Sequence, residues 1–146
     1  MIEYTVKVSE DKTEWYLNGK RHREDGPAIE RADGDKSWWL NDELHRVDGP
    51  AVEWADGSKH WWLNGKRHRV NAPAAELADG SKHWYFNGRR HRVDGPAAEL
   101  ADGGKEYWLN GKPLSKKEFK ERTSKKELTI NEIESLLGYK VKIVNN

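Results

Sequence analysis

Hydrophobic and polar residues alternate over short runs, and the same run returns every 23 residues along the chain. Each run has two adjacent aromatic residues, one further apolar residue and an asparagine, at residues 15–18, 38–41, 61–64, 84–87 and 107–110. Alternation with a period of two is typical of β-strands. A fixed spacing without insertions indicates one supersecondary unit stacked in a row.

Two kinds of turn sequence separate these runs. Asp-Gly recurs at 33–34, 56–57, 79–80 and 102–103, and Asn-Gly at 18–19, 64–65, 87–88 and 110–111, with Asn41-Asp42 in the second copy. Both dipeptides favour two-residue hairpin turns, which need positive φ at the central residues. The sequence therefore predicts a mainly β fold, a single-layer antiparallel meander of β-hairpin repeats over residues 1–111.

The turn geometry also predicts which side chains share a face. If Asp33-Gly34 is a two-residue loop, Ile29 lies opposite Trp38 and Glu30 lies opposite Ser37. A packing face then collects the first aromatic residue of each pair, with the leucines and Trp54. An open face collects the second aromatic residues with arginines and glutamates, namely Tyr16, Trp39, Trp62, Tyr85, Trp108, Arg21, Arg67, Arg90, Arg69, Arg92, Glu53 and Glu76.

These repeats resemble the MORN family over residues 15–111, in the 23-residue period and in the Gly19-Lys20-Arg21-His22 start. They depart from the family pattern after the histidine, where Arg23 and Asp25 stand in place of two glycines. The resemblance implies an elongated sheet of hairpins that binds or scaffolds other molecules. The His-Arg-x-Asp-Gly-Pro-Ala segment is also similar to repeats in small bacterial and phage proteins.

Composition agrees with a thin sheet. Only 35% of the residues are hydrophobic, and eight Trp and five Tyr carry much of the apolar surface. A net charge of +1 is far from that of a strong duplex-DNA binder. The absence of cysteine excludes disulfides and thiolate metal sites. Because residues 1–7 carry no apolar signal region and no stretch approaches a membrane span, we expect a cytoplasmic protein without a membrane partner.

The repeat pattern ends before residues 112–146, which we treat as a separate C-terminal segment. Capping boxes predict helices after Ser115 and Thr129, the second ending at Gly138. The alternation in residues 139–144 predicts a final strand. We expect a small α/β cap that covers part of the packing face, and the alternative is a docking or dimerising helix.

Catalytic and metal chemistry are weaker interpretations of the polar residues. The recurring histidines each lie in a different repeat, opposite a tryptophan, at positions 22, 45, 68 and 91. Metal sites need three or four converging ligands, so we expect no metal and no cofactor. The predicted pairs Glu53–His60 and Glu76–His83 could act as a general base or form a structural ladder. Two equivalent copies without a nucleophile favour the ladder and a protein that is not an enzyme.

The aromatic and arginine stripe of the open face is the strongest functional candidate. Tryptophan, tyrosine and arginine are the commonest hot spots of protein interfaces, which predicts a protein partner that the chain blocks or scaffolds. The same groups stack nucleobases, so nucleotides or single-stranded nucleic acid are the alternative, and glycans a weaker one. The interleaved glutamates argue against a long nucleic-acid track. A purely structural ladder stays open, and the apolar area and open strand edges predict a homodimer.

Overall fold

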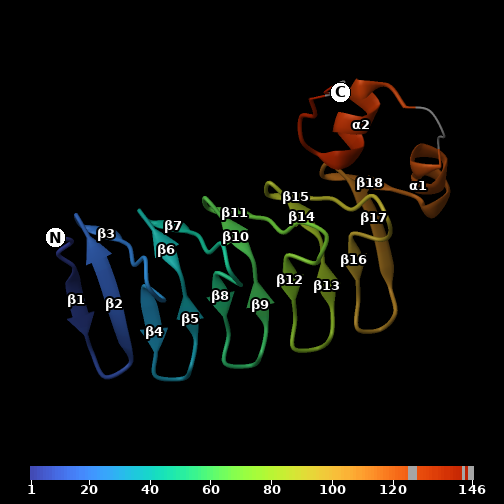
Figure 1. Cartoon of the computed structure of the whole chain (residues 1–146). Coiled ribbons are helices and arrows are strands. Elements are labelled where there is room, and N and C mark those ends of the chain that lie inside the picture. The colour runs from blue at the N-terminus through green and yellow to red at the C-terminus, as the bar shows by residue number, and fades with distance from the viewer. Residues whose placement is uncertain (125–127, 143, 145–146) are drawn as a thin grey trace.

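The computed structural model describes residues 1–124, 128–142 and 144, and these residues form 18 strands and two helices. The strands stand side by side as a row of hairpins, and both helices lie at the C-terminal end of this row (Figure 1). All strand pairs in the described residues are antiparallel. The predicted mainly β architecture of hairpin repeats is confirmed.

The main sheet has 12 strands. Three further two-stranded hairpins, one in each of three repeats, are not part of this sheet. Along its path lie β1 (Thr5–Val8), β2 (Lys12–Leu17), β4 (Ile29–Arg31), β5 (Lys36–Ser37), β8 (Val52–Glu53), β9 (Lys59–His60), β12 (Ala75–Glu76), β13 (Lys82–His83), β16 (Ala98–Glu99), β17 (Lys105–Leu109) and β18 (Lys112–Leu114). Strand β3 (Lys20–Arg21) pairs with β2. The further hairpins are β6 (Trp39–Leu40) with β7 (Glu43–Leu44), β10 (Trp62–Leu63) with β11 (Lys66–Arg67), and β14 (Tyr85–Phe86) with β15 (Arg89–Arg90).

The Asn-Gly turns have the predicted two-residue geometry. Asn18 and Gly19 both have positive φ, at 52° and 77°, and Tyr16 therefore lies opposite Arg21. Asn41 and Asp42 adopt the same conformation, at 51° and 66°. The strain of a side chain at the second position is offset there because the Asp42 carboxylate accepts the Arg21 backbone N–H at 2.8 Å.

The Asp-Gly turns differ from the prediction by one residue. Ile29 lies opposite Ser37, which leaves a three-residue loop between Arg31 and Asp35. Of the three loop residues only Gly34 has positive φ, at 104°. The Asp33 carboxylate accepts the Asp35 N–H at 3.0 Å, which favours a type I turn followed by a left-handed glycine. The predicted two-residue loop is therefore wrong.

This shift in register changes which residues share a face. Adjacent aromatic residues still point to opposite sides, as predicted, since Arg21 lies over Trp39 while Arg46 lies over Trp38. We call the side that carries Tyr16, Trp39, Trp62, Tyr85 and Trp108 the ladder face. We call the side that carries Trp15, Trp38, Trp61, Trp84 and Tyr107 the loop face. The glutamates at 30, 53, 76 and 99 lie on the loop face, not beside the stripe as predicted.

The core is thin and is built around small residues. Ala28, Ala51, Ala74 and Ala97 are fully buried. The carbonyl of each accepts the backbone N–H of a loop-face tryptophan at 2.7 to 2.8 Å. Within the described residues no large side chain is fully buried, which is the pattern of a single sheet without a second layer.

The C-terminal segment forms both predicted helices, α1 (Lys116–Thr123) and α2 (Ile130–Leu137). Each begins with the expected capping box, and α2 ends at Gly138 with φ of 80°. The predicted final strand is wrong for residues 139–142, which form none; residues 143, 145 and 146 lie outside the described part of the chain. Glu134 of α2 accepts the Val141 N–H at 3.1 Å and turns this stretch back onto the helix.

The helices cover the end of the loop face. Phe119 of α1 is buried with its ring 4.9 Å from that of Tyr107, and the Tyr139 ring lies 5.1 Å from that of Phe86. The prediction that this segment covers part of the packing face is confirmed. Neither helix in the described residues has the length and apolar character needed to cross a membrane.

Candidate functional site

An arginine on the loop face holds each repeat together. The guanidinium carbon of Arg46 lies 3.9 Å from the centroid of the Trp38 ring. Its Nε donates to Asp48 at 2.9 Å, and its Nη1 donates to the Pro50 carbonyl at 3.1 Å and to Glu53 at 2.9 Å. These contacts satisfy the guanidinium within its own repeat and fix the loop that follows the histidine.

The same arrangement recurs in the other copies, with Arg23 on Trp15, Arg69 on Trp61 and Arg92 on Trp84 at 3.9 to 4.0 Å. Each of these arginines also donates to the glutamate seven residues later. Four residues predicted for the open stripe, Arg69, Arg92, Glu53 and Glu76, therefore lie on the opposite face as internal partners. The two glutamates were misplaced because a one-residue slip in register moves side chains to the other face. The two arginines were misplaced because the chain leaves the strand before them and bonds to the next repeat.

The third repeat shows what this arrangement requires. At Gly26, Gly49 and Gly95 an added Cβ would lie 2.9 to 3.0 Å from the neighbouring arginine Cζ. Ala72 supplies such a Cβ, and within the described residues Arg69 makes no bond to Asn71, the residue in the position of Asp48. The Arg69 side chain is 31% exposed, against 22% for Arg46. With Asn71-Ala72 in place of Asp-Gly, the loop of the third repeat therefore has fewer contacts to its arginine.

The recurring histidines join neighbouring repeats. Nδ1 of each accepts the backbone N–H of the turn asparagine 19 residues later, at 2.9 to 3.1 Å. Burial lowers the pKa of His68 and of His91, which favours the neutral ring that this role needs. Among the described residues no group of three or more potential ligands could hold a metal ion.

The ladder face brings together the other predicted site residues as alternating rings and cations. Arg67 lies between Trp62 and Tyr85, with its Cζ 5.2 and 5.3 Å from the two ring centroids. Arg90 lies between Tyr85 and Trp108, at 5.9 and 5.3 Å. Nearer the N-terminus, Arg21 lies 5.1 Å from the Trp39 ring and Lys7 lies 4.6 Å from that of Tyr16. Leu44, opposite Trp39, interrupts the alternation.

The cation at the centre of this stripe, Arg67, has no acidic partner among the described residues. Glu14 and Glu106 lie at the two ends of the stripe, and the equivalent positions between them hold Ser37, His60 and His83. Arg90 is paired with Glu106 at 2.7 Å, whereas within the described residues Arg67 makes no ion pair. The Nε atom of Arg67 and the Nε1 atom of Trp62 are buried, and neither has a hydrogen-bond partner among the described residues.

Two histidines lie beside Arg67, away from their predicted partners. His60 lies opposite Val52, and Ala75 lies between His60 and His83. The predicted pairs Glu53–His60 and Glu76–His83 are therefore not formed. Burial is the main cause that lowers the pKa of His60, followed by Arg67, and burial followed by Arg90 lowers that of His83. Trp54, predicted for the packing face, packs edge-on to His60 at 6.4 Å and is 45% exposed.

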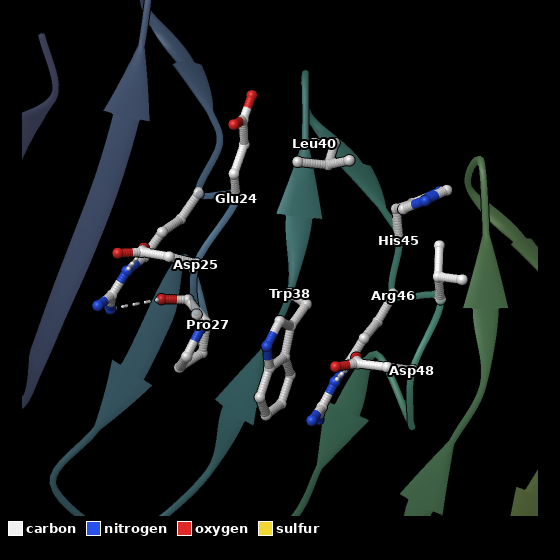
Figure 2. Close-up of a pocket in the computed structure, with 11 residues that line it drawn as sticks. Glu24, Asp25, Pro27, Trp38, Leu40, His45, Arg46 and Asp48 are labelled. Carbon is white, nitrogen blue, oxygen red and sulfur yellow. Dashed lines mark hydrogen bonds and ion pairs between the residues drawn. The ribbon is translucent and has the colours of Figure 1, made fainter. Parts of the chain in front are cut away.

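No pattern in the sequence predicted a groove on the loop face. Its walls are two successive loops, one from Arg23 to Pro27 and one from His45 to Asp48, and the Trp38 ring lies between them (Figure 2). Such a groove depends on how neighbouring loops stack, which strand alternation does not specify.

A scan against protein-family models found no match to this chain, and a search of curated proteins also found none.

Proposed function

We propose that the chain is a cytoplasmic, non-enzymatic protein-binding module built from MORN-like repeats, and that the centre of its ladder face is the contact surface. Its partner would be a protein that the chain blocks or scaffolds, as an accessory protein of a bacterium or phage. The observation that carries this proposal is Arg67, a cation between two aromatic rings without a carboxylate partner in the described residues.

Physical chemistry favours a partner that offers carboxylates to this surface. A half-buried guanidinium without an ion pair gains charge-assisted hydrogen bonds when an acidic group approaches its exposed part. Flanking tryptophan and tyrosine supply apolar area at low entropic cost, the composition of an interface centre. The arginines of the loop face lack this capacity because their own repeats already satisfy them.

The proposal is tested by comparing Arg67→Glu with Lys66→Glu in affinity capture from a bacterial lysate. Both substitutions change the charge equally in β11, but Lys66 lies opposite Leu63 and away from the stripe. We expect Arg67→Glu and the double variant Trp62→Ala/Arg67→Ala to lose proteins that the wild type and Lys66→Glu retain. Equal recovery by all four folded proteins would reject the ladder face as the contact surface.

Nucleotides or single-stranded nucleic acid are the second candidate, and one finding favours them. The glutamates at 30, 53, 76 and 99 were expected to repel phosphates from the stripe, but they lie on the other face. Titration with mixed oligonucleotides, followed by tryptophan fluorescence at two salt concentrations, separates the two candidates. A quench that weakens with salt would support nucleic acid, and no quench would remove it.

We also propose a homodimer formed through β1. This edge strand is exposed along its whole length, whereas α1 packs against the last hairpin at the other end of the sheet. Unpaired backbone groups of such an edge can pair with a second copy. Light scattering at tens of micromolar should give a dimer mass that Val6→Pro reduces to that of a monomer. A monomer mass for the wild type would contradict this proposal.

A further inference from the structure

The loop face carries two equivalent grooves, and one of them holds the chain's own C-terminal segment. Eleven residues between Arg23 and Asp48 line the first groove (Figure 2). Each has a counterpart 46 positions later in the lining of the second groove, between Arg69 and Asp94. The second groove has two additional lining residues, Leu137 and Tyr139, from the end of α2 and the residues after it.

The second groove therefore shows which ligand this geometry accepts. The Tyr139 ring lies 5.1 Å from that of Phe86, and Leu137 lines the same groove. Between them the Gly138 backbone comes so close that an added Cβ would be 2.9 Å from Asn110 Oδ1. An aliphatic residue, a left-handed glycine and an aromatic residue together form the bound element.

A histidine lies beside the helix end in this groove. Nδ1 of His91 accepts the Asn110 N–H at 2.9 Å. The backbone carbonyls of Leu136 and Leu137 lie near His91 and partly offset the lowering of its pKa by burial. These carbonyls belong to the last turn of α2, where helix acceptors lack partners within the helix. The histidine therefore contacts the neighbouring repeat through Asn110 and lies beside the end of a helix.

The first groove repeats these features without an occupant from the described residues. His45 stands in the position of His91, and its Nδ1 accepts the Asn64 N–H at 3.0 Å. Within the described residues its Nε2 makes no hydrogen bond or ion pair. Leu40 takes the place of Phe86. The groove volume is ≈ 800 Å³, against ≈ 290 Å³ where the C-terminal segment lies.

The rim of the first groove is more acidic than that of the second. Glu24 and Asp25 replace Val70 and Asn71, while Asp48 has its counterpart in Asp94. The Asp25 and Asp48 side chains are 80% and 84% exposed, although each accepts a bond from an arginine. A ligand for this groove therefore gains from a cation close to its apolar anchor.

We propose that the first groove binds the C-terminal end of a helix from a partner protein, in which an aliphatic residue, a glycine and an aromatic residue are followed by lysine or arginine. The chain's own segment has this order in Leu137, Gly138, Tyr139 and Lys140. That segment is tethered beside the second groove, where its effective concentration is high, so a second copy does not supply the ligand. This surface is on the opposite side from the ladder face.

The test uses a labelled synthetic peptide with the sequence of residues 129–142, titrated with the full-length protein and followed by fluorescence anisotropy. The variants are Val47→Lys, at the rim of the first groove, and Ala32→Lys, in the Asp33-Gly34 loop, as control with the same change in charge. Val47 is 84% exposed and Ala32 is also exposed, so neither substitution disturbs buried packing. We expect saturable binding to the wild type, a loss of about tenfold in affinity for Val47→Lys and a change below about twofold for Ala32→Lys.

A second peptide has alanine at the position of Tyr139 and should bind about tenfold more weakly than the first. No binding up to about 1 mM, equal binding by Val47→Lys and wild type, or equal binding of both peptides would each overturn the proposal. The variant Trp62→Ala/Arg67→Ala should bind the first peptide like the wild type. This result separates a failure of the groove from a failure of the ladder face.

Discussion

The two sets of arginines have different roles although both stack on aromatic rings. Arg46 is satisfied by three hydrogen bonds and by Trp38, and Arg67 has two rings without an ion pair in the described residues. We predict that Arg46→Gln lowers the free energy of unfolding by about 2 kcal/mol, whereas Arg67→Gln lowers it by less than about 1 kcal/mol. Urea titration followed by circular dichroism measures both. Equal losses would contradict the assignment of Arg46 to structure and Arg67 to binding.

The third repeat also suggests a test of coupling between neighbouring residues. In the second repeat, Gly49→Ala would place a Cβ 3.0 Å from Arg46 Cζ and displace the guanidinium from Asp48. We predict that Gly49→Ala costs about 1 kcal/mol, and that Asp48→Asn costs less in the Gly49→Ala background than alone. A double-mutant cycle by urea unfolding measures this difference. Additive costs would show that the two positions act independently.

At the scale of elements, the C-terminal segment depends on one glycine. Gly138 combines a φ of 80° with close contact to Asn110 and Phe86. Gly138→Ala should therefore weaken docking of α2 by about 1–2 kcal/mol and leave the sheet intact. Hydrogen exchange should increase at the amides of α2 but not in β2.

The matched control for this variant is Gly57→Ala. Gly57 has a similar φ of 91°, but nothing lies within 4 Å of its added Cβ. It should strain its own hairpin and leave exchange in α2 unchanged. If α2 is equally protected in wild type and Gly138→Ala, the close contact does not hold the segment.

At the scale of elements, some features of the fold could be predicted from the sequence and others could not. Strands, Asn-Gly turns and helix starts follow from local rules, since alternation, positive φ at asparagine and glycine, and capping boxes each involve adjacent residues. The prediction for the Asp-Gly loop is wrong because this dipeptide suits both a two-residue turn and a type I turn that ends in glycine. Asp33 selects the second through a bond to the Asp35 N–H at 3.0 Å. The equivalent bonds to Asp56 and Asp79 set the same register in the next two copies and so place Glu53 and Glu76 on the loop face.

The arginines after the histidines required information that no local rule contains. Arg21 and Arg23 are two residues apart, yet Arg21 contacts Trp39 on the ladder face and Arg23 contacts Trp15 on the loop face. The chain leaves the strand between them, where the Arg23 N–H donates to the Trp39 carbonyl of the next repeat. Strand alternation ends where the backbone bonds to a different repeat.

For the whole molecule, four histidines make stability depend on pH. Burial is the first cause that lowers the pKa of each, from the ordinary value of 6.5, at positions 60, 68, 83 and 91. The unfolded chain therefore binds more protons than the folded chain below about pH 6.5. We predict constant stability above that pH and a decline as the pH falls through the lowered folded-state values.

Urea midpoints between pH 8 and pH 4 at constant ionic strength measure this dependence, and a flat profile from about pH 7 to 5 would contradict it. A separate decline follows at lower pH, because hydrogen bonds lower the pKa of Asp48, Asp56 and Asp79. Replacement of His60 and His83 by glutamine should make the first decline smaller and leave the second decline unchanged.

The bond from each histidine to the asparagine 19 residues later joins each copy to the next one along the row. Excision of residues 47–69 would join Arg46 to Val70 and recreate the His-Arg-Val-Asn junction already present at 68–71. The shortened protein would keep both ends and lose a single ring-and-cation step of the ladder face. Gene duplication or deletion in units of 69 nucleotides could therefore set the length of the recognition surface without redesign of the fold.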